Sequence, residues 1–208
     1  MKSLWIAGAA VAVSAVCGAA GARDQGIDVL TALGGALRSA DAWRADYTQE
    51  YIAAGMSAGE VVAGVVTVGW PDRAVFKSGD PVTQLMGLEG RTVRLVDLEV
   101  PSCDEHLLGD DEWARVPLAA VLDPSGAVEH FAVLDHSPRG FTLVPHEPGG
   151  VDRVEVTLND NSLPLEVVIV DPQGATNRLT FTQWTAADAP VQGRWLPAIP
   201  AGLECVTD

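Results

Sequence analysis

Basic residues are scarce in this chain of 208 residues. Lysine and arginine together number 13 against 28 aspartates and glutamates, and the net charge is −15. No basic patch with interleaved aromatic residues occurs, so the sequence disfavours nucleic acid as a partner. Anionic membrane surfaces are disfavoured for the same reason. The acidic excess favours solubility, and solubility alone is enough to explain it.

Cysteine is rare too, and no metal-binding pattern surrounds the three cysteines. Cys103-Asp104-Glu105-His106 has no second cysteine or histidine at ligand spacing. We interpret this stretch, and Asp110-Asp111-Glu112 behind it, as a solvated loop. The sequence therefore predicts no metal site.

The common motifs of catalysis are missing as well. Ser125 and Ser137 stand in turn sequences rather than in a G-x-S-x-G elbow. His130 and His136 share a strand face by parity, but no third ligand stands near them. Asp171-Pro172-Gln173-Gly174 is a turn signal without the carboxylates of a calcium loop. We expect neither an enzyme nor a cofactor.

Residues 1–22 have the pattern of a secretory signal peptide. Lys2 supplies the positive start, Leu4–Ala20 is uncharged and apolar, and Ala20-Gly21-Ala22 is an A-x-A cleavage site. Cys17 raises the alternative of a lipid anchor, but Val16 before it is larger than the residue such sites usually carry. We therefore expect cleavage after residue 22 and a periplasmic protein.

The expected mature chain, residues 23–208, has one domain's length and no linker, repeat or low-complexity tract. Without Lys2, 12 basic residues face 28 acidic ones, a net charge of about −16. Cys103 and Cys205 are its two cysteines, and in an oxidising compartment we expect them to pair. Chain entropy gives such a bridge about 3–5 kcal/mol before strain.

The segment Gly64–Asp97 is the most informative part of the chain. Its short apolar runs are rich in β-branched residues and are separated by Gly69-Trp70-Pro71, Gly79-Asp80-Pro81 and Gly87-Leu88-Glu89-Gly90. Runs of this length favour strands, and each proline falls between runs, where its missing N–H costs no ladder hydrogen bond. The segment predicts an antiparallel meander.

Two helices and further strands complete the prediction. Apolar residues at helical spacing predict a helix over Ile27–Leu37, capped by Asp24, and Pro117–Leu122 predicts a short helix stopped by Asp123-Pro124. Trp43–Ile52 fits both a helical and a two-residue period, and we interpret it as a strand. The other expected strands are Glu60–Val68, Val128–Leu134, Gly140–Val144, Val151–Leu158, Leu165–Val170 and Arg178–Gln183.

About ten strands in one domain predict a mainly β fold, a single curved antiparallel sheet or incomplete barrel covered by short helices. The concave face of such a sheet needs helices or a ligand to fill it. The two predicted helices are short and apolar, so an alkyl chain could share the space with them. An ordinary packed core is the alternative.

In order and spacing, the chain from Ile27 to Val206 resembles the LolA-type periplasmic lipoprotein carriers. The resemblance is carried by the Gly64–Asp97 meander, which includes the Leu88–Val93 hairpin. Further motifs that match are Trp43–Gln49 as the first strand, Pro117-Leu118 in the helical lid, and Trp195–Gly202 as the aromatic, proline- and glycine-containing C-terminal motif. It implies an apolar cavity that shields the acyl chains of lipoproteins. We expect the ligand-binding side chains to be Trp43, Tyr47, Trp70, Phe76, Leu118 and Leu122.

The resemblance also implies partners. These are acylated lipoproteins or lipid, an inner-membrane ABC-type releasing complex and an outer-membrane acceptor, with the protein acting as a monomer. Two alternatives stay open, a lipid-sensing regulatory module of the RseB type and a carrier of another lipid or hydrophobic metabolite. RseB-type regulators normally have an additional C-terminal domain, whereas this sequence stops at Asp208.

One position departs from the family pattern. In the well-studied carriers, an arginine directly before the proline of the second strand locks the lid. Trp70 occupies that place here, and Arg73, three residues on, points to the opposite face of a strand. Two replacements for the arginine stay open: Trp70 could close the cavity by packing under the lid, or Arg73 could substitute despite its shift along the strand.

Overall fold

One sheet of twelve strands runs through the part of the chain that the computed structural model describes, residues 19–113, 117–190 and 193–207. Residues 1–18, and with them Cys17 and most of the expected signal peptide, lie outside the described residues. The strands are β1 (Ala42–Ile52), β2 (Glu60–Gly69), β3 (Arg73–Ser78), β4 (Gln84–Glu89), β5 (Thr92–Asp97), β6 (Ser102–Leu107), β7 (Phe131–Ser137), β8 (Gly140–Pro145), β9 (Arg153–Leu158), β10 (Pro164–Val170), β11 (Thr176–Ala187) and β12 (Val206–Thr207).

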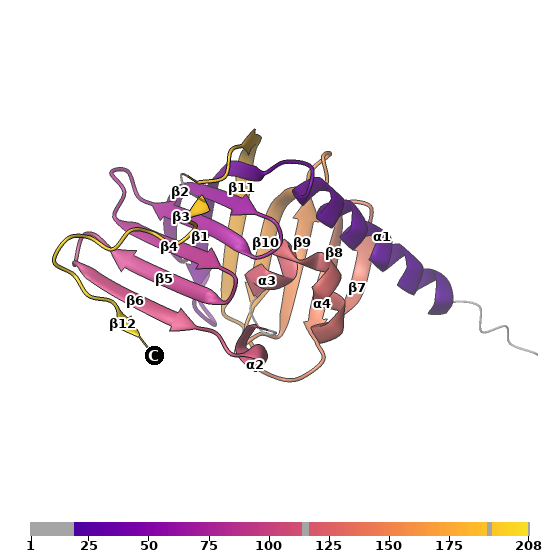
Figure 1. Cartoon of the computed structure of the whole chain (residues 1–208). Coiled ribbons are helices and arrows are strands. Elements are labelled where there is room, and N and C mark those ends of the chain that lie inside the picture. Colours follow the sequence, from indigo (N-terminus) through magenta and orange to yellow (C-terminus); the bar gives the residue numbers. More distant parts are fainter. Residues whose placement is uncertain (1–18, 114–116, 191–192, 208) are drawn as a thin grey trace, which may run out of the picture.

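The strand order is β12-β6-β5-β4-β3-β2-β1-β11-β10-β9-β8-β7. All neighbours are antiparallel except β12, which pairs in parallel with β6. The long β1–β11 ladder joins the half made of β2–β6 to the half made of β7–β10. Because β12 and β7 are the two ends, the sheet does not close (Figure 1). The predicted mainly β fold with an open antiparallel sheet is confirmed.

Four helices accompany the sheet in the described residues: α1 (Ala19–Leu37), α2 (Asp110–Trp113), α3 (Pro117–Leu122) and α4 (Pro124–His130). In Figure 1, α1, α3 and α4 gather over the half of the sheet that holds β7–β10. Helix α1 contacts β7, β8 and α4, and α3 contacts α4. None of the helices in the described part is both long and apolar enough to cross a bilayer.

The main core lies between the inner face of the sheet and these helices. Leu33 and Leu37 recur on one face of α1 and are buried in this core. Val121 of α3 is buried there too. Val66 and Phe76 stand among the strand residues of the same core. The two-residue alternation of the strands therefore supplies one apolar surface, which the helices cover.

Two boundaries in the helical part correct the sequence prediction. Helix α1 begins at Ala19, so Asp24 lies inside the helix and does not cap it; Ala-rich residues carry the helix further back. The expected strand Val128–Leu134 is wrong at its start, because α4 continues to His130 and β7 begins at Phe131. Asp123 accepts a hydrogen bond from the Gly126 N–H, so Asp123-Pro124 starts a helix as well as ending one.

The expected solvated loop at Cys103–His106 is also wrong. These residues lie in β6, which pairs with β5 on one side and with β12 on the other. Charged residues are typical of strands near a sheet edge, because they oppose pairing with other chains. Asp110-Asp111-Glu112, expected in the same loop, belongs to α2.

The C-terminal strap, which we define as residues 193–205, crosses the outer face of the sheet (Figure 1). The Trp195 side chain is fully buried beneath it, and a Cβ atom on Gly69 would lie 2.5 Å from the Trp195 ring. Arg94 Nη1 donates to the Pro197 carbonyl oxygen at 2.8 Å. The predicted Cys103–Cys205 disulfide is present and fastens the end of the strap to β6.

Candidate functional site

An apolar cavity of about 240 Å³ lies between the inner face of the sheet and α3. Five strands (β1, β3, β4, β10 and β11) and one helix contribute side chains to it. The lining residues are Tyr47, Gln49, Phe76, Ser78, Gln84, Met86, Leu118, Val121, Val167, Ile169, Asn177, Leu179 and Phe181. The cavity spans the β1–β11 ladder, so residues far apart in the sequence meet there.

Strand register places these side chains together. Tyr47 stands opposite Phe181 and Gln49 opposite Leu179 across the β1–β11 ladder. On the other side of the cavity, Phe76 stands opposite Met86. Since alternate residues of a strand point to one face, each strand gives two or three side chains to the cavity.

One polar contact lies within the apolar lining. The Tyr47 and Ser78 hydroxyl oxygens are 2.7 Å apart, and the Tyr47 ring meets Phe76 edge to face with 5.3 Å between centroids. Burial raises the pKa of Tyr47, and the hydrogen bond from Ser78 only partly opposes this shift. The contact satisfies both hydroxyls, so it lets two polar groups stand in a surface suited to hydrocarbon.

The lining becomes more polar toward one end of the strands. Along β1, Tyr47 is buried, Gln49 is half-buried and Tyr51 is exposed. Gln49 Nε2 donates to Asn177 Oδ1 at 3.0 Å, and Gln84 lines the cavity from β4. The cavity thus has an apolar interior and an amide-bearing rim.

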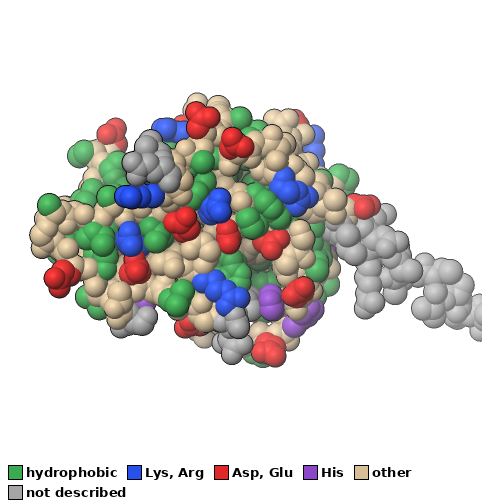
Figure 2. All heavy atoms as spheres, viewed as in Figure 1, with side chains coloured by type: hydrophobic (Ala, Val, Ile, Leu, Met, Phe, Trp, Pro, Cys, Tyr) green, Lys and Arg blue, Asp and Glu red, His purple; other side chains and the backbone are tan. Residues whose placement is uncertain are grey.

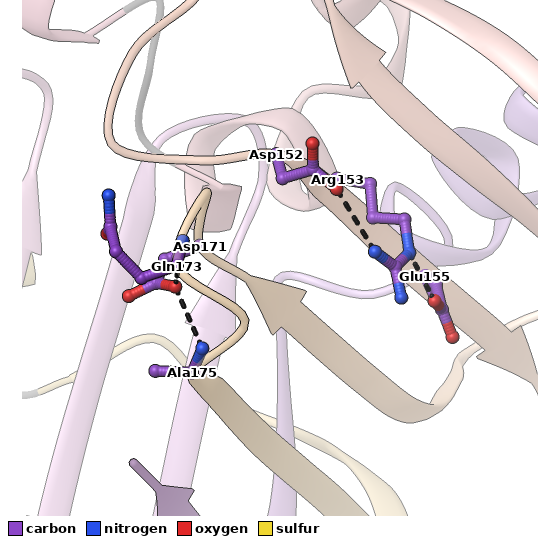
Figure 3. A network of polar contacts seen from close by, with 6 residues as sticks. All are labelled: Asp152, Arg153, Glu155, Asp171, Gln173 and Ala175. Carbon is purple, nitrogen blue, oxygen red and sulfur yellow. Dashed lines mark hydrogen bonds and ion pairs between the residues drawn. The ribbon is translucent and has the colours of Figure 1, made fainter. Parts of the chain in front are cut away.

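The turn between β10 and β11 supports this rim, since it joins the strand of Ile169 to the strand of Asn177. Asp171 Oδ1 accepts from the Gln173 and Ala175 N–H groups at 2.9 and 2.8 Å (Figure 3). On the neighbouring β9, Arg153 bridges Asp152 and Glu155, and these contacts raise the Arg153 pKa. The Asp171 turn needs no metal ion, because backbone N–H groups satisfy its carboxylate.

Helix α3 covers the cavity and packs on α4, which gives no lining residue; we call the two helices together the lid. Leu118 and Val121 of α3 point into the lining, while Leu122 is buried in the core beside them. Asp123 caps α4 directly after α3 ends, so the lid is two short helices with a sharp junction. Helices of six and seven residues have little stability of their own and depend on this packing.

The structure brings together three of the six expected ligand-binding residues. Tyr47, Phe76 and Leu118 line the cavity, whereas Trp43, Trp70 and Leu122 are absent from its lining. Sequence reasoning did not name Gln49, Ser78 or the lining residues of β10 and β11. Alternation along β1 and β3 could have found Gln49 and Ser78, since each stands two residues from an expected lining residue.

The two tryptophans contact α1 and the residues that follow it. Trp43 Nε1 donates to the Ala36 carbonyl oxygen at 3.1 Å. The Arg38 guanidinium lies over the Trp70 ring, 4.6 Å from its centroid. Both tryptophans are half-buried against the main core. They hold the C-terminal end of α1 rather than the cavity wall.

The described residues hold no cluster of three or more His, Cys, Asp or Glu side chains able to bind a metal ion. Cys103, which begins the acidic stretch of β6, is in the disulfide and offers no thiolate. What the cavity can do chemically is therefore to bury an apolar group and present amides at its mouth.

The family model described as outer membrane lipoprotein carrier protein LolA matches residues 38–193, three quarters of the chain. The chain belongs to the LolA family. Proteins of this family are periplasmic carrier and binding proteins for lipoproteins or lipids, and they are not enzymes. No curated protein sequence matches the chain.

Several solved structures are similar to this chain at low sequence identity. An uncharacterized conserved protein from Thermus thermophilus matches with a TM-score of 0.53 and 12% identity, over 88% of this chain and 98% of that one. A chain of the Pseudomonas aeruginosa MucA/MucB complex matches with a TM-score of 0.47 and 19% identity, over 81% of this chain. This LolA-family chain spans 60% of that protein's length. The LolA superfamily protein NE2245 from Nitrosomonas europaea matches with a TM-score of 0.45 and 9% identity, over 81% of this chain and 96% of that one.

Proposed function

We propose that this LolA-family protein is a periplasmic carrier that shields the acyl chains of lipoproteins during transfer toward the outer membrane. The observation that carries the proposal is the apolar cavity beneath the α3–α4 lid. Its interior is hydrocarbon-like, and its amide rim could face the polar part of an acylated cargo. Each buried methylene would contribute about 0.8 kcal/mol to binding.

The size of the cavity implies that the lid moves. At about 240 Å³ it is smaller than the ~300–1,000 Å³ typical of sites for small organic ligands. The closed form therefore has room for part of one acyl chain. We propose that α3 and α4 swing away as a unit when cargo enters, because they pack on each other and are joined at Asp123.

The proposed role includes the rest of a transfer route. A signal peptide over residues 1–22 would deliver the protein to the periplasm. An inner-membrane ABC-type complex would supply the lipoprotein, and an outer-membrane acceptor would receive it. The protein would act as a monomer, with Tyr47, Phe76 and Leu118 contacting cargo. Trp43 and Trp70 would hold the end of α1, and Leu122 would pack in the core beside the lining.

The test is to isolate the protein from the periplasm and identify any bound lipid or lipoprotein by mass spectrometry. Titration with a fluorescent alkyl probe then measures the affinity of the cavity. Replacing Leu118 with Gln should weaken probe binding at least several-fold, since it places an amide in the apolar lining. The matched control is Leu134→Gln, a change at an exposed leucine of β7 outside the lining.

Two results would contradict the carrier function. One is the absence of any copurified apolar molecule together with no saturable probe binding. The other is equal loss of affinity in the Leu118 and Leu134 variants, because a surface leucine would then matter as much as the lining.

A further inference from the structure

A second concavity of about 1,050 Å³ lies on the outer face of the sheet, opposite the cavity. Its floor is the outward side of β1–β5, and its wall is the C-terminal strap together with Ala187, Asp188 and Pro190. We call it the outer groove. It is larger than most small-molecule sites, which suits a polypeptide segment better than a small ligand.

Positive charge is concentrated in this groove although the protein is acidic. Arg44, Lys77, Arg94 and Arg194 line it, against a single lining carboxylate, Asp188. Arg94 is paired with Glu105, but no ion pair joins the other three cations to any described residue. With only 13 basic residues in the chain against 28 acidic ones, this grouping runs against the composition.

Exposed apolar side chains stand between these cations. Val82, Leu98 and Ile199 line the groove with 40%, 41% and 42% of their surfaces exposed. At the left of Figure 2, Lys and Arg side chains lie beside hydrophobic ones, with acidic side chains among them. A surface that alternates apolar and cationic groups is complementary to a chain that alternates apolar and acidic ones.

The wall of the groove is held firmly in place. A Cβ atom on Gly87 would lie 2.5 Å from the Trp195 carbonyl oxygen, so the strap sits directly on β4. Arg94 donates a hydrogen bond to the Pro197 carbonyl oxygen, and the Cys103–Cys205 disulfide fixes the C-terminal end of the strap to β6. A rigid wall lowers the entropy cost of ordering a bound segment against it.

We propose that the outer groove binds an acidic segment of a partner protein, one that carries leucine-like side chains between its carboxylates. The cations would pair with the carboxylates, and Val82, Leu98 and Ile199 would cover the apolar side chains. An anionic bilayer is the less favoured occupant, because its headgroups would extend beyond the groove over the acidic surface of a protein of net charge −15, whereas a narrow segment can stay within the groove. The groove lies across the sheet from the cavity, so this docking site is separate from the proposed cargo site.

The probe for this site is a fluorescent synthetic peptide of alternating glutamate and leucine, titrated into the full-length protein by anisotropy. We expect saturable binding that weakens as salt rises, and no binding of the lysine–leucine counterpart. Neutralising two groove cations in Lys77→Gln/Arg194→Gln should lower the affinity about tenfold. The control Arg73→Gln/Arg139→Gln removes the same charge outside the groove and should bind as the parent protein does.

Amide shifts in NMR spectra locate the peptide. Shifts at Thr67, Val75 and Leu85 on the floor, with an unchanged alkyl-probe affinity, would support docking in the groove. Shifts at the cavity rim, or equal weakening in both double variants, would overturn it. Binding of phosphatidylglycerol vesicles without binding of the acidic peptide would overturn it in favour of a membrane surface. Loss of alkyl-probe binding alone would count against the carrier function and not against the groove.

Discussion

The hydroxyl oxygens of Tyr47 and Ser78 lie 2.7 Å apart within the apolar lining of the cavity, and both side chains are buried. Neither residue is near the other in the sequence; β1 and β3 bring them together across β2. The pair is a fixed polar contact in a site that otherwise presents hydrocarbon, so its energetics can be tested separately from ligand binding.

Tyr47→Phe should lower the free energy of unfolding by about 1–3 kcal/mol, because it leaves the buried Ser78 hydroxyl without a partner. The double variant Tyr47→Phe/Ser78→Ala removes both groups and should recover part of that loss. Urea unfolding of the parent, both single variants and the double variant measures the coupling. Strictly additive losses would mean that the two hydroxyls do not interact.

The raised Tyr47 pKa predicts a loss of stability at high pH. The unfolded chain would release this proton near pH 10.0, while the folded protein retains it to higher pH. The folded state then binds more protons than the unfolded state, so the stabilisation is complete below pH 10.0 and is lost as pH rises through the folded pKa. Urea midpoints across this range should fall less for Tyr47→Phe. An equal fall in both proteins would assign the effect to other groups.

Gly87 should be intolerant of any side chain. Its missing Cβ leaves room for the strap, with the Trp195 carbonyl oxygen and Pro197 as the atoms that a methyl group would meet. Gly87→Ala should therefore cost about 1–3 kcal/mol through overpacking. Gly150→Ala is the matched control, since nothing lies within 4 Å of a Cβ there. Similar unfolding midpoints for the two variants would show that the strap does not rest on β4.

The disulfide should stabilise the strap and the whole sheet. Its two cysteines are 102 residues apart, and chain entropy predicts a loss of about 4–5 kcal/mol when such a loop is opened. Cys103→Ser/Cys205→Ser should also expose Trp195, which is buried under the strap. Denaturant unfolding measures the first effect, and a red shift in tryptophan fluorescence reports the second. A stable variant with an unshifted spectrum would mean that noncovalent contacts hold the strap.

Local patterns in the sequence account for most of the sheet. The breakers around Pro71 and Pro81 separate β2, β3 and β4 as predicted, because turn chemistry and two-residue alternation agree there. Strand β6 was missed because its acidic residues suggest a loop, and its pairing with β5 is a tertiary effect. Helix α4 was missed because Asp-Pro is compatible with both an end and a start.

The cavity was only half predictable for a related reason. Tyr47 and Phe76 could be placed by alternation and apolar character, but the lining from β11 depends on which strand lies beside β1. That neighbour is more than a hundred residues away, and no local signal identifies it. The position of Trp70 likewise depends on where α1 ends.

Trp70 provides the last test, since the sequence suggested a gate there and the structure places its ring under Arg38. Trp70→Ala should lose the cation–π contact, about 0.5–1 kcal/mol, and with it part of the packing at the end of α1. We expect lower stability and an alkyl-probe affinity changed less than by Leu118→Gln. Arg38→Gln removes the same cation–π contact without leaving the void that loss of the indole ring creates. It should therefore reproduce only the part of the stability loss that comes from this contact. If Trp70→Ala instead weakened probe binding as strongly as Leu118→Gln at equal stability, Trp70 would act as the gate, and the lid would have to reach it in the loaded state.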